Sequence, residues 1–240
     1  MGGRLDGRVA FVTGASRGIG RAIAEAFGRE GARVALFARK QEDLEKVAAA
    51  IAAGGGETLV LPGDVTQSAD VNHAVEEILA RWDRVDILVN NAGVGYFAPL
   101  SDLTEAQWDQ MMAVNLKGPF LCTKAVWPIF IRQKAGHVVN ISSVAGTTTK
   151  EGGAGYSATK WGMQAVTETL MKEAKPHKIK VSVIAPGSVD TYFNDKEPGQ
   201  GPSYALKPSD VAQVALDIVA APAGVIINEV VVRPLVPPSR

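Results

Sequence analysis

The sequence predicts a single doubly wound α/β domain over residues 1–240, with a seven-stranded, mostly parallel sheet and helices on both faces. Three observations predict it: short apolar runs recur along the chain, helical patterns separate them, and no linker, repeat or charge block divides the chain. Runs that are apolar at every position are typical of parallel strands, because helices cover both faces of such a sheet. Alternation of strand and helix from end to end favours the doubly wound arrangement.

The expected strands are seven apolar runs bounded by Gly, Pro, Asn or Asp, which favour turns. In chain order they are 8–14, 33–39, 58–64, 85–93, 137–143, 180–187 and 225–232.

The expected helices lie between these runs, at 20–30, 41–53, 68–82, 104–134 and 209–220. Ser68 and Ser209 stand where N-caps are expected, since each is followed by Asp at a helix start. The polar, Gly- and Pro-rich stretch 194–203 is interpreted as part of a substrate lid, at about 188–207, rather than as a domain boundary.

Composition narrows the class of protein. The 25 basic residues balance the 25 acidic ones, so charge gives no reason to expect nucleic acid or an anionic membrane as a partner. The single cysteine, Cys122, excludes an internal disulfide and fits a reducing cytoplasm. No segment approaches the roughly 20 apolar residues that span a bilayer. The histidines, His73, His137 and His177, lack a paired spacing, so no metal site is expected.

A glycine-rich turn follows the first expected strand. Gly14, Gly18 and Gly20 have the spacing G-x-x-x-G-x-G and lead directly into an amphipathic helix. A turn without side chains lets backbone N–H groups and a helix N-terminus approach a pyrophosphate. The alternative is a glycine-rich turn without a ligand. The position of the glycine turn at the end of the first expected strand favours a dinucleotide site.

The residues after the second expected strand bear on the choice of cofactor. An acidic residue there would accept a hydrogen bond from the ribose 2′-OH and select NAD. Here Arg39 and Lys40 precede the first acid, Glu42. A cation suits a 2′-phosphate, and Arg17 in the glycine turn is within reach of the same group. NADP(H) is therefore expected in preference to NAD(H), with solvated residues that open the next helix as the alternative.

Six motifs in order resemble the short-chain dehydrogenase/reductase family in its common single-domain form, which has a Rossmann fold. They are "TGASRGIG" at 13–20, "NNAG" at 90–93, Asn115, "SS" at 142–143, "YSATK" at 156–160 and "PGSVDT" at 186–191. The resemblance covers nearly the whole chain. It implies an enzyme that acts on CH–OH donors with a nicotinamide cofactor.

The resemblance also implies the site residues. The motif serine lies thirteen residues before the tyrosine, which selects Ser143 over Ser142. The implied catalytic residues are Asn115, Ser143, Tyr156 and Lys160. The implied cofactor-binding residues are Gly14, Ser16, Arg17, Gly18, Ile19, Gly20, Arg39, Asp64, Val65, Asn91, Ala92, Gly93, Tyr156, Lys160, Pro186, Gly187, Val189 and Thr191. Among these, Asp64 and Val65 are expected at the adenine and Lys160 at the nicotinamide ribose.

The spacing of Tyr156 and Lys160 has a physical meaning. Residues i and i+4 share one face of a helix, so the ammonium is expected near the phenol. A positive charge there favours the phenolate and lowers the pKa of the tyrosine, which suits proton transfer. Ser143 would hydrogen-bond the substrate oxygen. Asn115 is either a buried amide at a helix kink or the anchor of a proton-relaying water, and both can hold.

The predicted activity is NADP(H)-dependent interconversion of a carbonyl, either ketone or aldehyde, and an alcohol. The glycine turn and "NNAG" are similar to 3-oxoacyl-carrier-protein reductases, whereas the ending "INEVVVRPLVPPSR" looks more like reductases of small hydroxy acids and semialdehydes. A dinucleotide-binding regulator without catalysis is the alternative from another class. The family implies a homo-oligomer, with a tetramer favoured. An accessible pocket under the lid is expected.

Overall fold

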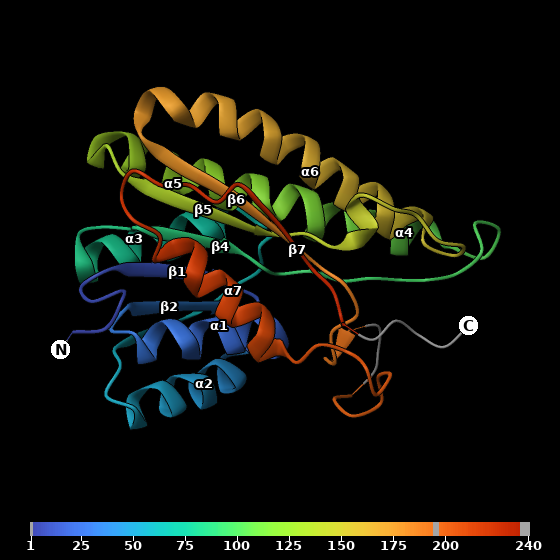
Figure 1. Cartoon of the computed structure of the whole chain (residues 1–240), viewed down its shortest axis with the longest axis horizontal. Helices are drawn as coiled ribbons and strands as arrows, with labels where there is room; N and C mark the ends of the chain where they lie inside the picture. The colour runs from blue at the N-terminus through green and yellow to red at the C-terminus, as the bar shows by residue number, and fades with distance from the viewer. Residues whose placement is uncertain (1, 194–196, 236–240) are drawn as a thin grey trace.

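The chain forms one seven-stranded sheet covered by helices on both faces (Figure 1). A computed structural model describes residues 2–193 and 197–235. The strand order is β3-β2-β1-β4-β5-β6-β7, and every neighbouring pair is parallel. The strands are β1 Val9–Thr13, β2 Arg33–Ala38, β3 Thr58–Pro62, β4 Ile87–Asn90, β5 Gly136–Ile141, β6 Ile179–Pro186 and β7 Glu229–Val232. The predicted fold class is confirmed.

Two layers of helices enclose the sheet. The helices are α1 Gly18–Arg29, α2 Gln41–Ala53, α3 Ser68–Trp82, α4 Glu105–Met112, α5 Gly118–Gln133, α6 Ala154–Ala174 and α7 Pro208–Val219. One buried cluster joins α1, α2 and α7 to the sheet, and a second joins α3 and α5. Successive residues of β1 point to opposite layers: Val9 and Phe11 pack into the second cluster, and Ala10 and Val12 into the first. This is why the strands are apolar throughout.

The last strand differs from its prediction. It begins at Glu229 rather than at 225, because a turn in which Val225 N–H donates to the carbonyl of Pro222 precedes it. Among the described residues it pairs only with β6 and lies at the edge of the sheet, and 46% of Val231 is exposed. An apolar run does not reveal whether a strand lies at an edge, so burial on both faces was a wrong expectation here.

The helix starts also differ in detail. Ser68 and Ser209 lie inside the first turns of α3 and α7, whose N-caps are Gln67 and Lys207. Neither serine is therefore the predicted cap. In α7, Pro208 occupies the first helical position, where its missing N–H costs nothing, and the Asp210 carboxylate accepts from the N–H of Lys207.

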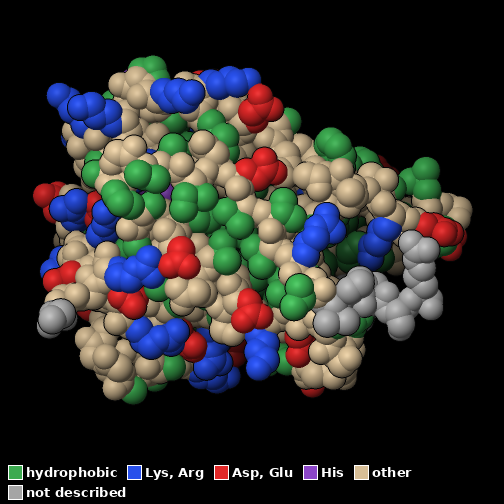
Figure 2. Space-filling model, in the orientation of Figure 1, with side chains coloured by type: hydrophobic (Ala, Val, Ile, Leu, Met, Phe, Trp, Pro, Cys, Tyr) green, Lys and Arg blue, Asp and Glu red, His purple; other side chains and the backbone are tan. Residues whose placement is uncertain are grey.

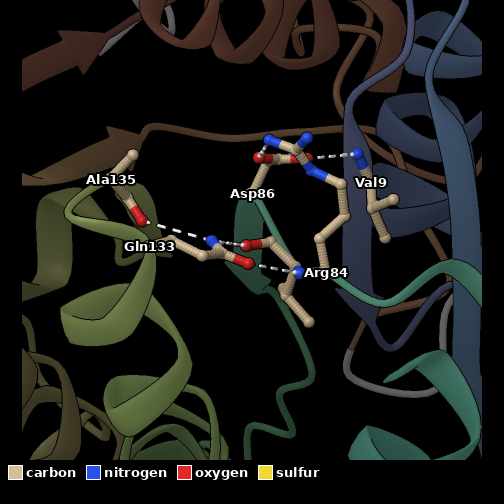
Figure 3. Close-up of polar contacts among 6 residues, drawn as sticks. Val9, Arg84, Asp86, Gln133 and Ala135 are labelled. Carbon is tan, nitrogen blue, oxygen red and sulfur yellow. Dashed lines mark hydrogen bonds and ion pairs between the residues drawn. The ribbon is translucent and has the colours of Figure 1, made fainter. Parts of the chain in front are cut away.

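A polar network fastens the amino ends of β1 and β4 (Figure 3). The Asp86 carboxylate accepts from the N–H of Val9 at 2.8 Å and from two guanidinium nitrogens of Arg84 at 2.6 and 2.9 Å. Gln133, at the end of α5, exchanges two hydrogen bonds with the backbone of Val85. These contacts fix the register of β1 and β4, the two strands between which the crossover direction reverses. The carboxyl ends of the same strands carry the candidate site.

Candidate active site

The predicted site residues lie after the carboxyl ends of the strands. The glycine turn follows β1, Arg39 follows β2, Asp64 and Val65 follow β3, the 91–93 stretch follows β4, Ser143 follows β5, and Gly187 follows β6. In a parallel sheet the carboxyl ends of all strands lie along the same side, which we call the carboxyl edge. A ligand crevice forms at this edge where the strand order reverses, which here is between β1 and β4.

The glycine turn has a backbone that side chains would disturb. Gly14 and Gly18 have positive φ values, 64° and 58°, which L side chains rarely adopt. A Cβ on Gly20 would collide with the carbonyl oxygen of Gly14. The first N–H groups of a helix have no intrahelical acceptor, and Arg17, the N-cap of α1, supplies no side-chain cap. The turn therefore offers free backbone donors, a helix N-terminus and space, which fit a pyrophosphate.

Asn91 fastens this turn to β4. Its side-chain amide donates to the carbonyl oxygens of Thr13 and Gly14 at 3.0 and 3.2 Å. In return the hydroxyl of Thr13 accepts from the N–H groups of Asn91 and Ala92 at 3.0 and 3.1 Å. Thr13 was not among the predicted site residues; a polar residue ending an otherwise apolar strand is the signal that could have found it.

Cations gather where the adenosine end of a dinucleotide would lie. Arg17, Arg39 and Lys40 are all exposed. The pKa of Asp43, in the first turn of α2, is lowered mainly by the hydrogen bond and charge of Lys46, and further by the charges of Lys40 and Arg17. Within residues 2–193 and 197–235, neither Arg17 nor Arg39 forms an ion pair. Their guanidinium groups are thus available to an anionic ligand.

The residues that follow β3 and β6 also lie at the carboxyl ends of the strands. Asp64 is half-buried, and one carboxylate oxygen accepts from the N–H of Thr66 at 2.8 Å. Val65 is buried and lies against Gly118, the first residue of α5. After Pro186 the chain returns over the glycine turn, where the Thr191 side chain lies against Gly18.

Tyr156 and Lys160 share one face of α6, directed at the end of β5. The Lys160 ammonium lies 5.7 Å from the centre of the Tyr156 ring and donates to the carbonyl oxygen of Ile141 at 2.9 Å. Ser143 caps the short helical turn Val144–Gly146, and its hydroxyl accepts from the N–H of Ala145 at 3.1 Å. The structure thus brings a hydroxyl, a phenol and an ammonium together.

Burial dominates the proton affinities of this group. It lowers the pKa of Lys160 to about 8, because an ammonium is poorly solvated there. It raises the pKa of Tyr156 to about 12, while a hydrogen bond with Ser143 acts in the opposite direction. From the i, i+4 spacing in the sequence, the lysine was predicted to lower the pKa of the tyrosine. That expectation is wrong in direction, because the loss of solvation on burial is the largest effect on the pKa of Tyr156.

Asn115 lies in a π-helical turn, Ala113–Lys117, that interrupts the predicted 104–134 helix between α4 and α5. Its buried side-chain oxygen accepts from the N–H of Val94, and its nitrogen donates to the carbonyl of Val94, both at 2.8 Å. The same nitrogen donates to the hydroxyl of Thr159 at 3.1 Å. The side chain therefore ties the loop after β4 to α6. The predicted water anchor remains a prediction.

Aromatic rings cover the phenol. The ring centres of Phe97 and Phe193 each lie 5.3 Å from that of Tyr156. Phe193 also lies so close to Gly95 that a Cβ there would collide with it. Tyr156 is left 8% exposed, and the accessible pocket expected under the lid remains a prediction. Phe193 belongs to the predicted 188–207 lid, whose base is closed by a bridge between Val189 and Leu206; residues 194–196 lie outside the described residues.

The described residues, 2–193 and 197–235, lack two further features. None of the helices there is both long enough and apolar enough to cross a bilayer. No group of three or more His, Cys, Asp or Glu side chains in the same residues could hold a metal ion.

A doubly wound sheet whose carboxyl edge carries a phosphate-accepting turn and a Tyr–Lys pair is the architecture of a dinucleotide-dependent oxidoreductase. The family model for short chain dehydrogenases matches residues 8–200. The chain belongs to the short-chain dehydrogenase/reductase family, and it is an oxidoreductase of the kind that acts on CH–OH donors.

Relatives and solved structures agree with this assignment. A 3-oxoacyl-[acyl-carrier-protein] reductase from Thermotoga maritima is 34% identical over 95% of this chain and 96% of its own. An alcohol dehydrogenase from Thermococcus sibiricus, complexed with 5-hydroxy-NADP, superimposes with a TM-score of 0.91 at 34% identity, covering 97% of this chain and 99% of that one. A metagenomic short-chain oxidoreductase in complex with NADP gives 0.86 at 41% identity, covering 98% and 100%.

Proposed function

We propose that the protein is an NADP(H)-dependent oxidoreductase that interconverts a carbonyl compound and an alcohol, with Tyr156 as the general acid and base. The observation that carries the proposal is the convergence of Ser143, Tyr156 and Lys160 at the edge of the sheet that also holds the glycine turn. A direct test is a panel of ketones, aldehydes and 3-oxoacyl thioesters incubated with the purified protein and NADPH. Loss of NADPH with none of them would contradict the proposal.

The residues at this edge fit the cofactor. Backbone N–H groups at the start of α1 would hold the pyrophosphate, Asp64 and Val65 the adenine, and Lys160 the nicotinamide ribose. Arg17 and Arg39 carry the charge that a 2′-phosphate needs. When bound, the cofactor supplies or accepts a hydride. The NADP complexes of the two similar structures support the same choice.

The side chains supply the proton chemistry. In the direction of reduction, Tyr156 would donate its phenolic proton to the substrate oxygen, and Ser143 would donate a hydrogen bond to the same oxygen. With a pKa of about 8, Lys160 is mostly an ammonium at neutral pH. Its charge offsets part of the cost of forming a buried phenolate. In the direction of oxidation each proton transfer reverses.

The cover over Tyr156 indicates the kind of substrate. Phe97 and Phe193 each pack against the Tyr156 ring, and they also pack against each other, with their ring centres 6.2 Å apart. Since polar groups would lose their hydration there without gaining a partner, an apolar or aromatic substituent on the carbonyl carbon is favoured. Because both rings cover Tyr156, we expect the substrate to displace the ring of Phe193 or of Phe97 when it reaches the phenolic oxygen.

Arg39→Asp tests the choice of cofactor. A charge-assisted contact with a 2′-phosphate contributes roughly 1.5–3 kcal/mol, and a carboxylate in its place would repel the phosphate. The ratio of kcat/KM for NADPH to that for NADH should therefore fall by at least about tenfold. Lys178→Asp makes the same charge change just before β6, at the amino ends of the strands and away from the site. It should leave the ratio of kcat/KM for the two cofactors unchanged. Equal use of both cofactors by the wild-type enzyme would contradict the assignment.

We also propose that the enzyme is a cytoplasmic homo-oligomer, most simply a tetramer. Phe120 on α5 and Trp161 and Val166 on α6 are 52%, 50% and 42% exposed. A hollow of about 600 Å³ lies beside Trp161. Hydrophobic side chains also gather across the middle of the face that carries β7 and α7 (Figure 2), where Val225 and Ile226 are exposed.

Two separate apolar surfaces suit the two kinds of interface that a tetramer with three perpendicular twofold axes requires. Sedimentation at micromolar concentration should therefore give a mass about four times 25.3 kDa. A monomer throughout that range would refute the oligomer.

A further inference from the structure

Tyr192 makes a contact that the proposed chemistry does not use. It lies in the lid, two residues after Asp190, and its exposed ring lies 5.3 Å from the guanidinium carbon of Arg17. Arg17 belongs to the glycine turn and is the N-cap of α1. The preceding lid residue, Thr191, lies against Gly18. Two consecutive lid residues therefore rest on two consecutive residues of the turn.

The ring and a phosphate would not compete for Arg17. A guanidinium stacks on an aromatic ring through its flat face, whereas its N–H donors point outward in its plane. If the Tyr192 ring takes the face of the guanidinium, its N–H edge stays available to an anion. Arg17 also acts on the start of α2, since its charge contributes to the lowered pKa of Asp43, as does that of Lys40. Arg17 thus lies between the lid and the cations that follow β2.

The contact has an energetic consequence. Arg17 is exposed and has no acidic partner among the described residues, so without the ring its long side chain would be free to adopt many rotamers. Fixing such a side chain on a ligand costs conformational entropy. A ring that already holds the guanidinium removes part of that cost before the ligand arrives.

We infer that Tyr192 is a positioning residue for recognition of the adenosine 2′-phosphate: it holds Arg17 in place for that group. The inference rests on the proposed preference for NADP(H). Because NAD(H) lacks the 2′-phosphate, loss of the ring should weaken binding of NADPH and leave binding of NADH unchanged. Tyr192 would then contribute to cofactor choice from the lid, away from the end of β2 where Arg39 lies.

The test is a set of equilibrium dissociation constants for NADPH and NADH, measured without substrate by the change in nicotinamide fluorescence. Tyr192→Leu should raise the constant for NADPH roughly two- to fivefold, the range of a cation–π contact at an exposed site, with no change for NADH. Tyr192→Phe keeps the ring and should bind both like the wild type. Tyr204→Leu alters the other lid tyrosine, which stacks on no cation among the described residues, and should have no selective effect.

A double-mutant cycle completes the test. In an Arg17→Met background, adding Tyr192→Leu should cause no further loss of NADPH affinity, because the cation that the ring holds is gone. An equal loss for both cofactors, or the same loss with and without Arg17, would overturn the inference while leaving the proposed function intact. If the wild-type protein binds both cofactors equally, the proposed preference fails, and the inference fails with it.

Discussion

Tyr156→Phe should reduce kcat by a factor of about 10²–10⁴, the usual contribution of a positioned acid or base, while NADPH binding changes little. Phenylalanine keeps the ring that packs against Phe97 and Phe193, so only the hydroxyl is lost. The variant should therefore fold normally and lack the transferable proton. Steady-state turnover and NADPH fluorescence titration measure the two effects separately.

Tyr96→Phe is the matched control. Tyr96 is half-buried, and its hydroxyl donates to the side chain of Gln110 at 2.8 Å rather than facing Ser143. Its removal should leave kcat close to the wild-type value. If Tyr156→Phe retained a large part of the wild-type rate, or if both variants lost activity equally, Tyr156 would not be the proton donor.

Lys160→Ala should have the second large effect, lowering kcat and raising the dissociation constant of NADPH together. Lys160 is only 3% exposed, and its ammonium donates to the carbonyl of Ile141. Its removal takes away the positive charge that favours the phenolate and the proposed contact with the nicotinamide ribose. The same two measurements used for Tyr156 separate proton transfer from binding.

Lys160→Met distinguishes loss of charge from loss of volume. Methionine fills most of the space of the lysine stem, so a defect caused only by a cavity would be largely restored. The expected result is that Lys160→Met is as impaired as Lys160→Ala in both turnover and NADPH affinity. Unchanged NADPH affinity in the methionine variant would contradict the ribose contact.

The sequence predicted the architecture because the local signals were strong and agreed with one another. Apolar runs such as 33–39 and 180–187 can be buried only in a covered parallel sheet, and Gly14 and Gly20 occupy positions that tolerate no side chain. The edge strand was predicted less well, because Val230 and Val231 read as buried although β7 has a neighbour on one side only.

The sequence predicted which residues come together in the site, but not how deeply Tyr156 is buried or how burial changes its pKa. The i, i+4 spacing placed Lys160 near Tyr156 correctly, whereas the direction of the tyrosine pKa depends on Phe97 and Phe193, which reach it from two distant loops. A helix kink at Asn115 was one of the two interpretations of that residue and is present, but its form, a π-helical turn, was not predicted. It is stabilised by the contacts of that amide with Val94 and Thr159, which no local pattern reveals.

The most direct test of the account is the transfer of hydrogen from the cofactor to a carbonyl compound. Purified protein would be incubated with an aromatic ketone and NADPH that carries deuterium at both C4 positions, and the product analysed by mass spectrometry. The account predicts an alcohol with one deuterium on the carbinol carbon, formed by the wild type and by Tyr96→Phe and nearly absent with Tyr156→Phe. Alcohol without deuterium, or with equal yield from Tyr156→Phe, would contradict it.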